Sequence, residues 1–191
     1  MSPMTMVTRV PLPESVNPVL VIEALHAYLP LIEANPYHIG HERRPVNLDE
    51  VVADPFFHDD GQKLAAFVVH DRIPIIKNVG SWATKDVVIP CVFQSFEYGV
   101  RCRADASGGV TVRSSYEVRP RGQVQGGPED IVRPGEGDHE LVEIATIDCL
   151  AIMKLFVKQG YNNAHQEILQ RVVDGLVRTP APQPEHYLPQ T

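Results

Sequence analysis

The feature that most constrains the fold is a series of short segments between His38 and Arg119 in which apolar and polar residues alternate. A long segment without proline, residues 139–177, comes later in the chain. The last short segment, Val110 to Arg119, is the clearest, because every second residue is apolar or small. The residues that share this face are Val110, Val112, Ser114, Tyr116 and Val118. This alternation is typical of strands with one buried face, so the region predicts an antiparallel sheet that needs a cover.

The long segment from His139 to Val177 is rich in helix formers, so it predicts a single helix, with Gly160 as its weakest point. A helix of that length, lying across the concave side of the sheet, would bury the open face. A cavity often remains between such a sheet and its helix. The expected fold class is therefore α+β, with a curved antiparallel sheet of six or seven strands wrapped on a long C-terminal helix.

The N-terminal part predicts a strand and then two short helices. Met4 to Leu12 forms the strand, which prolines close. Asn17 followed by Pro18 is typical of a helix start, and Pro30 predicts a break near Tyr28. Further strands are expected at residues 38–46, 63–73, 82–96 and 100–104.

We expect one domain, spanning residues 4–177. The segment 178–191 contains four prolines and is predicted to be a disordered tail. The segment 120–138 is rich in glycine and proline and predicts a long loop that could serve as a lid. Pro90, within the expected strand at 82–96, predicts an edge position or a bulge.

Charge and cysteine content indicate which partners and which cellular compartment to expect. The chain has 191 residues, with 17 Lys+Arg against 24 Asp+Glu and a formal net charge of −7, which argues against non-specific binding to nucleic acid or to an anionic membrane. No apolar run approaches the roughly 18 residues of a membrane span, and the N-terminus lacks an apolar signal core. Cys91, Cys102 and Cys149 are widely spaced among apolar residues, as expected for reduced core thiols in a cytoplasmic protein.

The order of elements resembles the START-like, or Bet v 1-like, helix-grip superfamily. Within it, four segments are similar to a fungal family described only as a domain of unknown function: Gly99–Ala106, Gly109–Val118, His70–Pro74 and Asn163–His165. The resemblance spans about Val7 to Val177. It implies a helix-grip fold around a lipophilic cavity. Because some members are encoded beside fungal polyketide synthases, it also implies a role in polyketide cyclisation or product release.

Three residues are candidates for catalysis. On a helical wheel of the long segment, Asp148 falls on the apolar half, where a desolvated carboxylate could act as acid or base, although it could instead bond an arginine of the sheet. His70 follows an apolar run and could transfer protons, but adjacent strand residues face opposite ways, so only one of His70 and Asp71 can line the cavity. Tyr116 shares the apolar face of its strand and could donate to an enolate or carbonyl oxygen, or simply pack.

Six further residues are expected to contact a ligand. Val112 and Ser114 lie on the same strand face as Tyr116, and Trp82 could form a cavity wall. The helical wheel places Ile152 and Phe156 on the apolar side, and Asn163 could bind a ligand carbonyl or contact water. The expected ligand-binding set is therefore Trp82, Val112, Ser114, Ile152, Phe156 and Asn163.

No cofactor or metal is expected. The sequence has no G-x-S-x-G, Walker or G-x-G-x-x-G motif, and the spacing of His38, His41 and Glu42 would suit a metal only on a helix, whereas this segment reads as strand. Three arginines alternate with apolar residues in the expected strands: Arg101, Arg103 and Arg113. They are expected to face solvent, where they could dock an acidic carrier domain.

Three functions remain open from the sequence. The favoured one is an auxiliary protein that binds a linear polyketide chain and promotes its cyclisation or release, for example as a pyrone. The second is a non-catalytic carrier of a lipid or sterol, which needs the same cavity without proton transfer. The third is a docking module for a synthase, for which the cavity would be small or closed.

Overall fold

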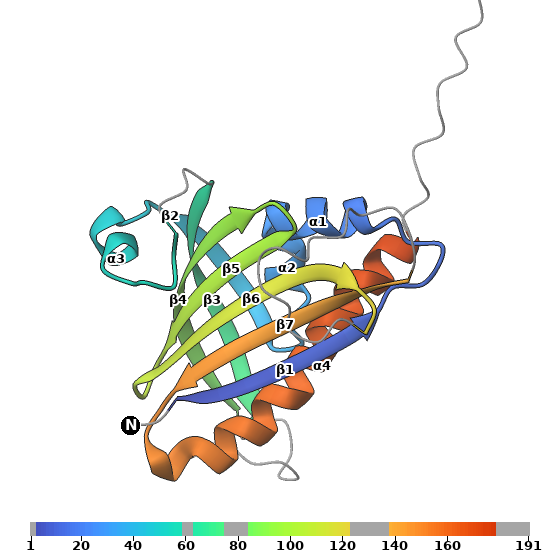
Figure 1. Cartoon of the computed structure of the whole chain (residues 1–191). Helices are drawn as coiled ribbons and strands as arrows, with labels where there is room; N and C mark the ends of the chain where they lie inside the picture. The colour runs from blue at the N-terminus through green and yellow to red at the C-terminus, as the bar shows by residue number, and fades with distance from the viewer. Residues whose placement is uncertain (1–2, 59–62, 75–83, 123–137, 179–191) are drawn as a thin grey trace, which may run out of the picture.

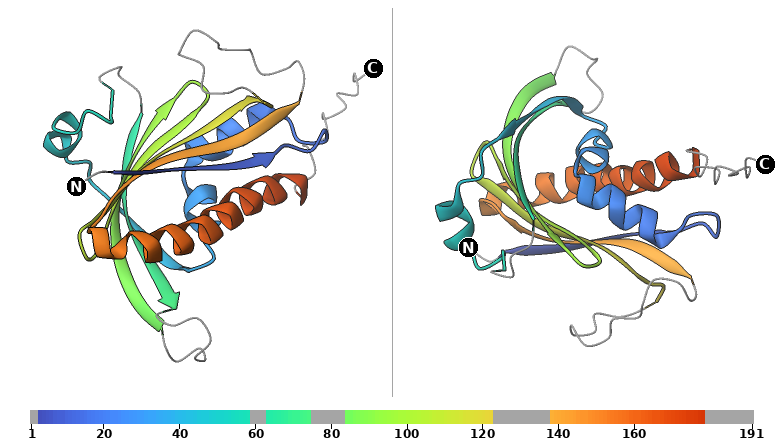
Figure 2. Two further views of the ribbon diagram at one scale, coloured as in Figure 1. Left: turned by 60° about the horizontal axis from the view of Figure 1, so that its bottom comes forward. Right: turned by 90° about the horizontal axis from the view of Figure 1, so that it is seen from above.

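The fold was analysed in a computed structural model, which describes residues 3–58, 63–74, 84–122 and 138–178. Seven antiparallel strands form one sheet in the order β1-β7-β6-β5-β4-β3-β2. The strands are β1 (Met4–Pro11), β2 (His38–Arg44), β3 (Leu64–Pro74), β4 (Thr84–Phe96), β5 (Gly99–Ala106), β6 (Val110–Pro120) and β7 (His139–Asp148). The C-terminal helix α4 (Lys154–Arg178) lies across the concave side of this curved sheet, so the expected fold class is confirmed (Figures 1 and 2).

The two short helices form as the sequence predicts. Asn17 accepts a hydrogen bond from the Val19 amide and caps α1 (Pro18–Ala27), whose first residue is a proline. Tyr28, with φ of 63°, then separates α1 from α2 (Leu29–Glu33). Both helices pack beside α4 on the concave side (Figure 2), where Val21 and Leu25 are fully buried.

The prediction of one helix from His139 is wrong. Residues 139–148 form strand β7, which pairs with β1 on one side and with β6 on the other. A one-turn 3-10 helix, η1 (Ala151–Met153), then leads into α4. The first half of β7 is buried on both faces, so it lacks the alternation by which the outer strands are recognised.

Pro90 lies in a strand that is only partly enclosed. On one side it pairs with Val68 of β3, but the ladder between β4 and β5 begins one residue later, at Cys91. The proline therefore stands where β4 has no partner on its β5 side, in agreement with the predicted edge position.

The main core lies between the concave face and the helices. It includes Leu25, Val100, Leu141, Leu169 and Val173, none more than 1% exposed. Among the described residues no helix is long and apolar enough to cross a membrane. All three cysteines are buried and free.

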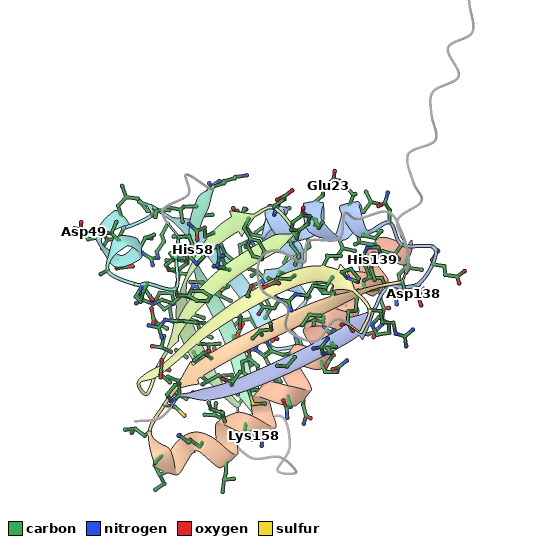
Figure 3. The ribbon with its side chains drawn as sticks, in the orientation of Figure 1. Glu23, Asp49, His58, Asp138, His139 and Lys158 are labelled. Carbon is green, nitrogen blue, oxygen red and sulfur yellow. The ribbon has the colours of Figure 1, made fainter. Side chains whose placement is uncertain are left out.

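The convex face carries a second, smaller layer. Helix α3 (Leu48–Val52) and the segment after it cover this side of the sheet, where Phe57 packs on Ala66 and Val92. Figure 3 shows Asp49 of α3 and His58 at one end of the sheet, with Asp138 and His139 at the other. The buried carboxylate of Asp54 accepts hydrogen bonds from Arg103 and Arg113 and fixes this layer to the sheet.

Candidate functional site

A partly open cavity of ≈180 Å³ lies between the concave face of the sheet, α2 and α4. It is similar in size to an engineered protein cavity of about 150 Å³ that holds one benzene ring. Most of its wall is apolar, with Leu31, Ile32, Val69, Ile89, Phe93, Ala104 and Ile168 among the lining side chains. Its polar lining comes from three parts of the fold: Ser114 and Tyr116 of β6, Tyr161 and His165 of α4, and, near β2, Asn35 just before that strand and Asp71 of the neighbouring β3.

A fully buried carboxylate stands directly behind one wall of the cavity. Glu143, in the middle of β7, is 0% exposed and accepts hydrogen bonds from three side chains of that wall. Oε1 accepts from Ser114 Oγ at 2.7 Å and from Tyr161 OH at 2.6 Å. His165 Nδ1 lies 2.8 Å from each carboxylate oxygen. Glu143 thus joins β6, β7 and α4 into one hydrogen-bonded unit.

The helix positions its two partners by their spacing. Tyr161 and His165 are four residues apart on α4, so they share one face and their rings stack with centroids 3.5 Å apart. Because Glu143 accepts at Nδ1, the neutral imidazole carries its proton on that atom, which leaves the lone pair on Nε2. Nε2 is therefore the basic nitrogen of His165, whose side chain lines the cavity.

The electrostatics keep Glu143 ionised. Burial alone raises the pKa of a carboxyl group, but the attraction of His165 in its protonated form and the hydrogen bonds from His165, Tyr161 and Ser114 outweigh this effect. The pKa of Glu143 consequently lies below its ordinary value. An ionised Glu143 stabilises the imidazolium that forms when His165 takes up a proton, as the aspartate of a Ser-His-Asp triad does.

Tyr116 lines the cavity beside this unit. It lies directly opposite Glu143 across the β6–β7 ladder, and burial together with the negative charge of Glu143 raises its pKa well above the ordinary value. The phenol therefore stays protonated. On its other side, a Cβ on Gly99 would stand 1.9 Å from the Tyr116 carbonyl oxygen, so only glycine allows β5 to approach β6 this closely.

A second buried carboxylate, Asp71, lines the cavity from β3 and is 4% exposed. Asn35 Nδ2 donates to its Oδ2 at 2.7 Å, and His38 Nδ1 lies 3.9 Å from its Oδ1. Burial raises the pKa of Asp71, and the hydrogen bond from Asn35 and the nearby histidines reduce the shift without cancelling it.

Three of the predicted site residues lie at the cavity, and a neighbour replaces a fourth. Val112, Ser114 and Tyr116 all line it, as the alternation of β6 predicts. Of the adjacent pair His70 and Asp71, it is Asp71 that faces the cavity, so the proposed place of His70 is wrong.

Three other predicted residues lie away from the cavity, because they were chosen on a helix that was expected to begin at His139, whereas α4 begins at Lys154. Asp148 ends strand β7 and is half exposed, with an oxygen 2.8 Å from Arg113 Nη1, so it bonds an arginine of the sheet and does not line the cavity. Ile152, in η1, is 90% exposed, and Asn163 is exposed on the outer side of α4. Trp82 and the side chain of Phe156 lie outside the described residues, as do most of the segment 120–138 and the tail from residue 179.

The arginines of the convex face do point away from the cavity, but none of the three is simply solvated, since Arg101 donates a hydrogen bond to Gln94 Oε1. Arg103 and Arg113 bind Asp54, and Arg113 also binds Asp148. Arg101 lies over the ring of Phe96 at 4.8 Å. Within the described segments no group of three or more His, Cys, Asp or Glu side chains has the arrangement of a metal site.

The sequence analysis missed Glu143, Tyr161 and His165. On the wheel started at residue 139, Glu143 and His165 fall on the side taken as polar, because residues that belong to strand β7 helped to define the apolar side. Within α4 alone, Tyr161 and His165 lie on the stripe that continues through Ile168 and Val172. An aromatic and a histidine on the apolar stripe of an amphipathic helix are the signal by which they could have been found.

Comparisons with known proteins give a family and a fold. The sequence of residues 1–177 matches the family described as "Domain of unknown function (DUF7053)". Among solved structures, the chain is similar to TTHA0849 from Thermus thermophilus, with 8% sequence identity and a TM-score of 0.54 over 92% of this chain and 97% of that chain. At this identity the likeness shows the fold alone. None of the curated proteins compared with the sequence matches it.

Proposed function

We propose that this chain, which belongs to the DUF7053 family, binds a short polyketide in its cavity and promotes cyclisation or release by proton transfer at His165. The observation that carries the proposal is the Glu143–His165 pair in the wall of a ring-sized, mostly apolar cavity. A buried carboxylate that binds Nδ1 of a cavity-lining imidazole and leaves Nε2 as the basic nitrogen is the arrangement expected of a general base.

The chemistry follows from the positions of the side chains. His165 Nε2 takes the proton from the enol hydroxyl of a 3,5-dioxo thioester, and Glu143 stabilises the resulting imidazolium. The enol oxygen attacks the thioester carbonyl, so a C–O bond forms, and the C–S bond then breaks. The imidazolium returns its proton to the departing thiolate. Tyr116, which stays protonated, donates a hydrogen bond to the oxygen that gains negative charge. The products are a pyrone and a free thiol.

The cavity size favours a product of one ring. At ≈180 Å³ the cavity holds about one ring with small substituents, which is much less than an extended long-chain polyketide occupies. A short chain confined there must fold back on itself, and confinement of the two reacting ends supplies much of the rate. The proposed substrate is therefore a triketide or a similarly short terminal segment.

The cellular setting is part of the same proposal. The order of elements and the segments that resemble the START-like superfamily support a fungal protein that works in the cytoplasm beside a polyketide synthase. The synthase would deliver the thioester, and the protein would bind the hydrophobic chain. Arg101, on the convex face, would contact an acidic carrier domain of the synthase.

A non-catalytic lipid carrier is the second candidate, because most of the cavity lining is apolar. A carrier needs the apolar wall but has no use for an imidazole held by a buried carboxylate. Recovery of an intact lipid from the purified protein, together with no turnover of a thioester, would favour this candidate.

The decisive experiment follows pyrone formation by absorbance, with the N-acetylcysteamine thioester of 3,5-dioxohexanoic acid as substrate. We expect the wild-type protein to accelerate release and His165→Gln to lose about 100-fold in kcat, because general-base catalysis contributes roughly 10²–10⁴-fold. The matched control is Asn162→Ala, an exposed residue on the outer side of the same helix. Full activity of the His165 variant would contradict the proposal.

A further inference from the structure

The cavity has a second polar end that the proposed reaction does not use. Asp71 Oδ2 is held by Asn35, but Oδ1 is buried and has no hydrogen-bond partner among the described residues. The side chain is more than nine-tenths buried and lines the cavity. A buried carboxylate oxygen without a donor is costly, so it needs a partner that enters the cavity.

The neighbouring side chains do not supply that partner. His38 Nδ1 lies 3.9 Å from Oδ1, beyond hydrogen-bond distance, and is itself buried without a hydrogen-bond partner among the described residues. The other nitrogen of His38 lies 3.2 Å from His41 Nδ1, and the two rings stack, which holds His38 in this position. Arg72, the next residue in β3, points the other way and binds Asp86 with two hydrogen bonds.

Asp71 and Tyr116 stand on opposite sides of the cavity. Asp71 is on β3 and Tyr116 on β6, and two strands lie between them in the sheet. The two residues are also offset along the strands, because Asp71 pairs with Val87 of β4, whereas Tyr116 pairs with Val100 of β5, which in turn pairs with Ser95 of β4. The apolar side chains of Ile89, Phe93 and Ala104 line the space between these two polar ends. Asp71 is therefore a polar group at one end of a mostly apolar cavity.

We infer that Asp71 Oδ1 accepts a hydrogen bond from a hydroxyl group of the ligand. The ligand class is then a hydroxy-carbonyl compound of about one ring in volume, whose hydroxyl meets Asp71. A hydroxyl fits better than an ammonium group, because an ammonium has three donors and this end of the cavity offers one free acceptor. The inference rests on the proposed function for the carbonyl end and adds a specificity-determining residue at the other.

The test is a pair of ligands that differ only in the donor. We would measure the binding of 4-hydroxyacetophenone and 4-methoxyacetophenone to the full chain by isothermal titration calorimetry. A hydrogen bond to a carboxylate predicts about tenfold tighter binding of the hydroxy compound by the wild-type protein. Asp71→Leu should remove or reverse this preference. The control Asp86→Asn, at an exposed position of β4, should keep it.

The outcomes separate this inference from the proposed function. Equal affinity of the wild-type protein for the two ketones, or binding of neither, would overturn the role of Asp71, and this comparison does not depend on how any variant folds. The proposed function fails instead if His165→Gln releases pyrone at the wild-type rate. A His165 variant that prefers the hydroxy compound but turns over slowly would support both.

Discussion

Glu143 and Asp71 are both buried carboxylates on the inner face of one sheet, yet they are held in opposite ways. Glu143 accepts hydrogen bonds from Ser114, Tyr161 and His165, whereas Asp71 accepts one, from Asn35. The pKa of Glu143 is accordingly lowered, and burial raises the pKa of Asp71. Burial costs both groups their hydration, so the number of donors decides whether the charged form is favoured.

The difference assigns the two groups different tasks. Glu143 has its partners within the protein and does not line the cavity, so it acts on a ligand only through His165. It is a positioning residue. Asp71 faces the cavity with one oxygen free, so it is available to a ligand. The following predictions test this contrast in order of decreasing effect.

Glu143→Gln should have the largest effect. The amide removes the negative charge beside His165 and places an N–H group among the donors Ser114, Tyr161 and His165. We therefore expect a loss of about 3 kcal/mol in the free energy of unfolding. We also expect a lower kcat, because His165 loses the carboxylate that positions its imidazole. Urea unfolding and pyrone release measure the two effects. Glu167→Gln, an exposed change on α4, is the control and should alter neither.

Tyr161→Phe should come next. It removes one donor to Glu143 and keeps the ring that stacks on His165, so we expect a loss of about 1.5 kcal/mol in the free energy of unfolding. With fewer donors the pKa of Glu143 should rise, which NMR titration of the carboxyl carbon can follow. An unchanged pKa would mean that His165 alone holds the charge.

Asp71→Asn should have a smaller effect of the opposite sign. Because the folded-state pKa of Asp71 is raised, its ionised form lowers the free energy of unfolding at neutral pH. This loss disappears as pH falls through the folded-state pKa toward the ordinary pKa of 3.8. The variant should therefore be more stable than wild type at pH 7 and equal to it at low pH. For Glu143 the sign is reversed. Its ionised form adds to the free energy of unfolding in full above the ordinary pKa of 4.5, and this stabilisation is lost as pH falls through the lowered pKa of the folded state. Urea unfolding across pH 3–8 checks both slopes.

Much of the fold could be predicted because the decisive signals are local. The alternation of β6, the Asn17 cap and the break at Tyr28 each depend on a few neighbouring residues. Strand β7 could not be read in this way, because it lies between two strands and is buried on both faces in its first half. Its β-branched residues, such as Val142 and Ile144, were the remaining local sign of a strand.

The site was harder to predict because tertiary contacts assemble it. Ser114, Tyr161 and His165 reach Glu143 across 29, 18 and 22 positions of sequence. The site element that the sequence analysis did find was the inner face of β6. Asp148 was chosen on a helical wheel, and because the segment is a strand, the apolar half of that wheel does not exist.

The smallest expected effect concerns this displaced candidate. Asp148 forms an ion pair with Arg113 on the convex face, where water screens the attraction, and Arg113 keeps Asp54 as a second partner. Asp148→Asn should thus change the free energy of unfolding by less than about 1 kcal/mol and leave pyrone release unchanged. The convex face would then carry structure alone while the concave face carries the chemistry. A slower release in this variant, at unchanged stability, would mean that the arginines of the convex face take part in delivering the substrate.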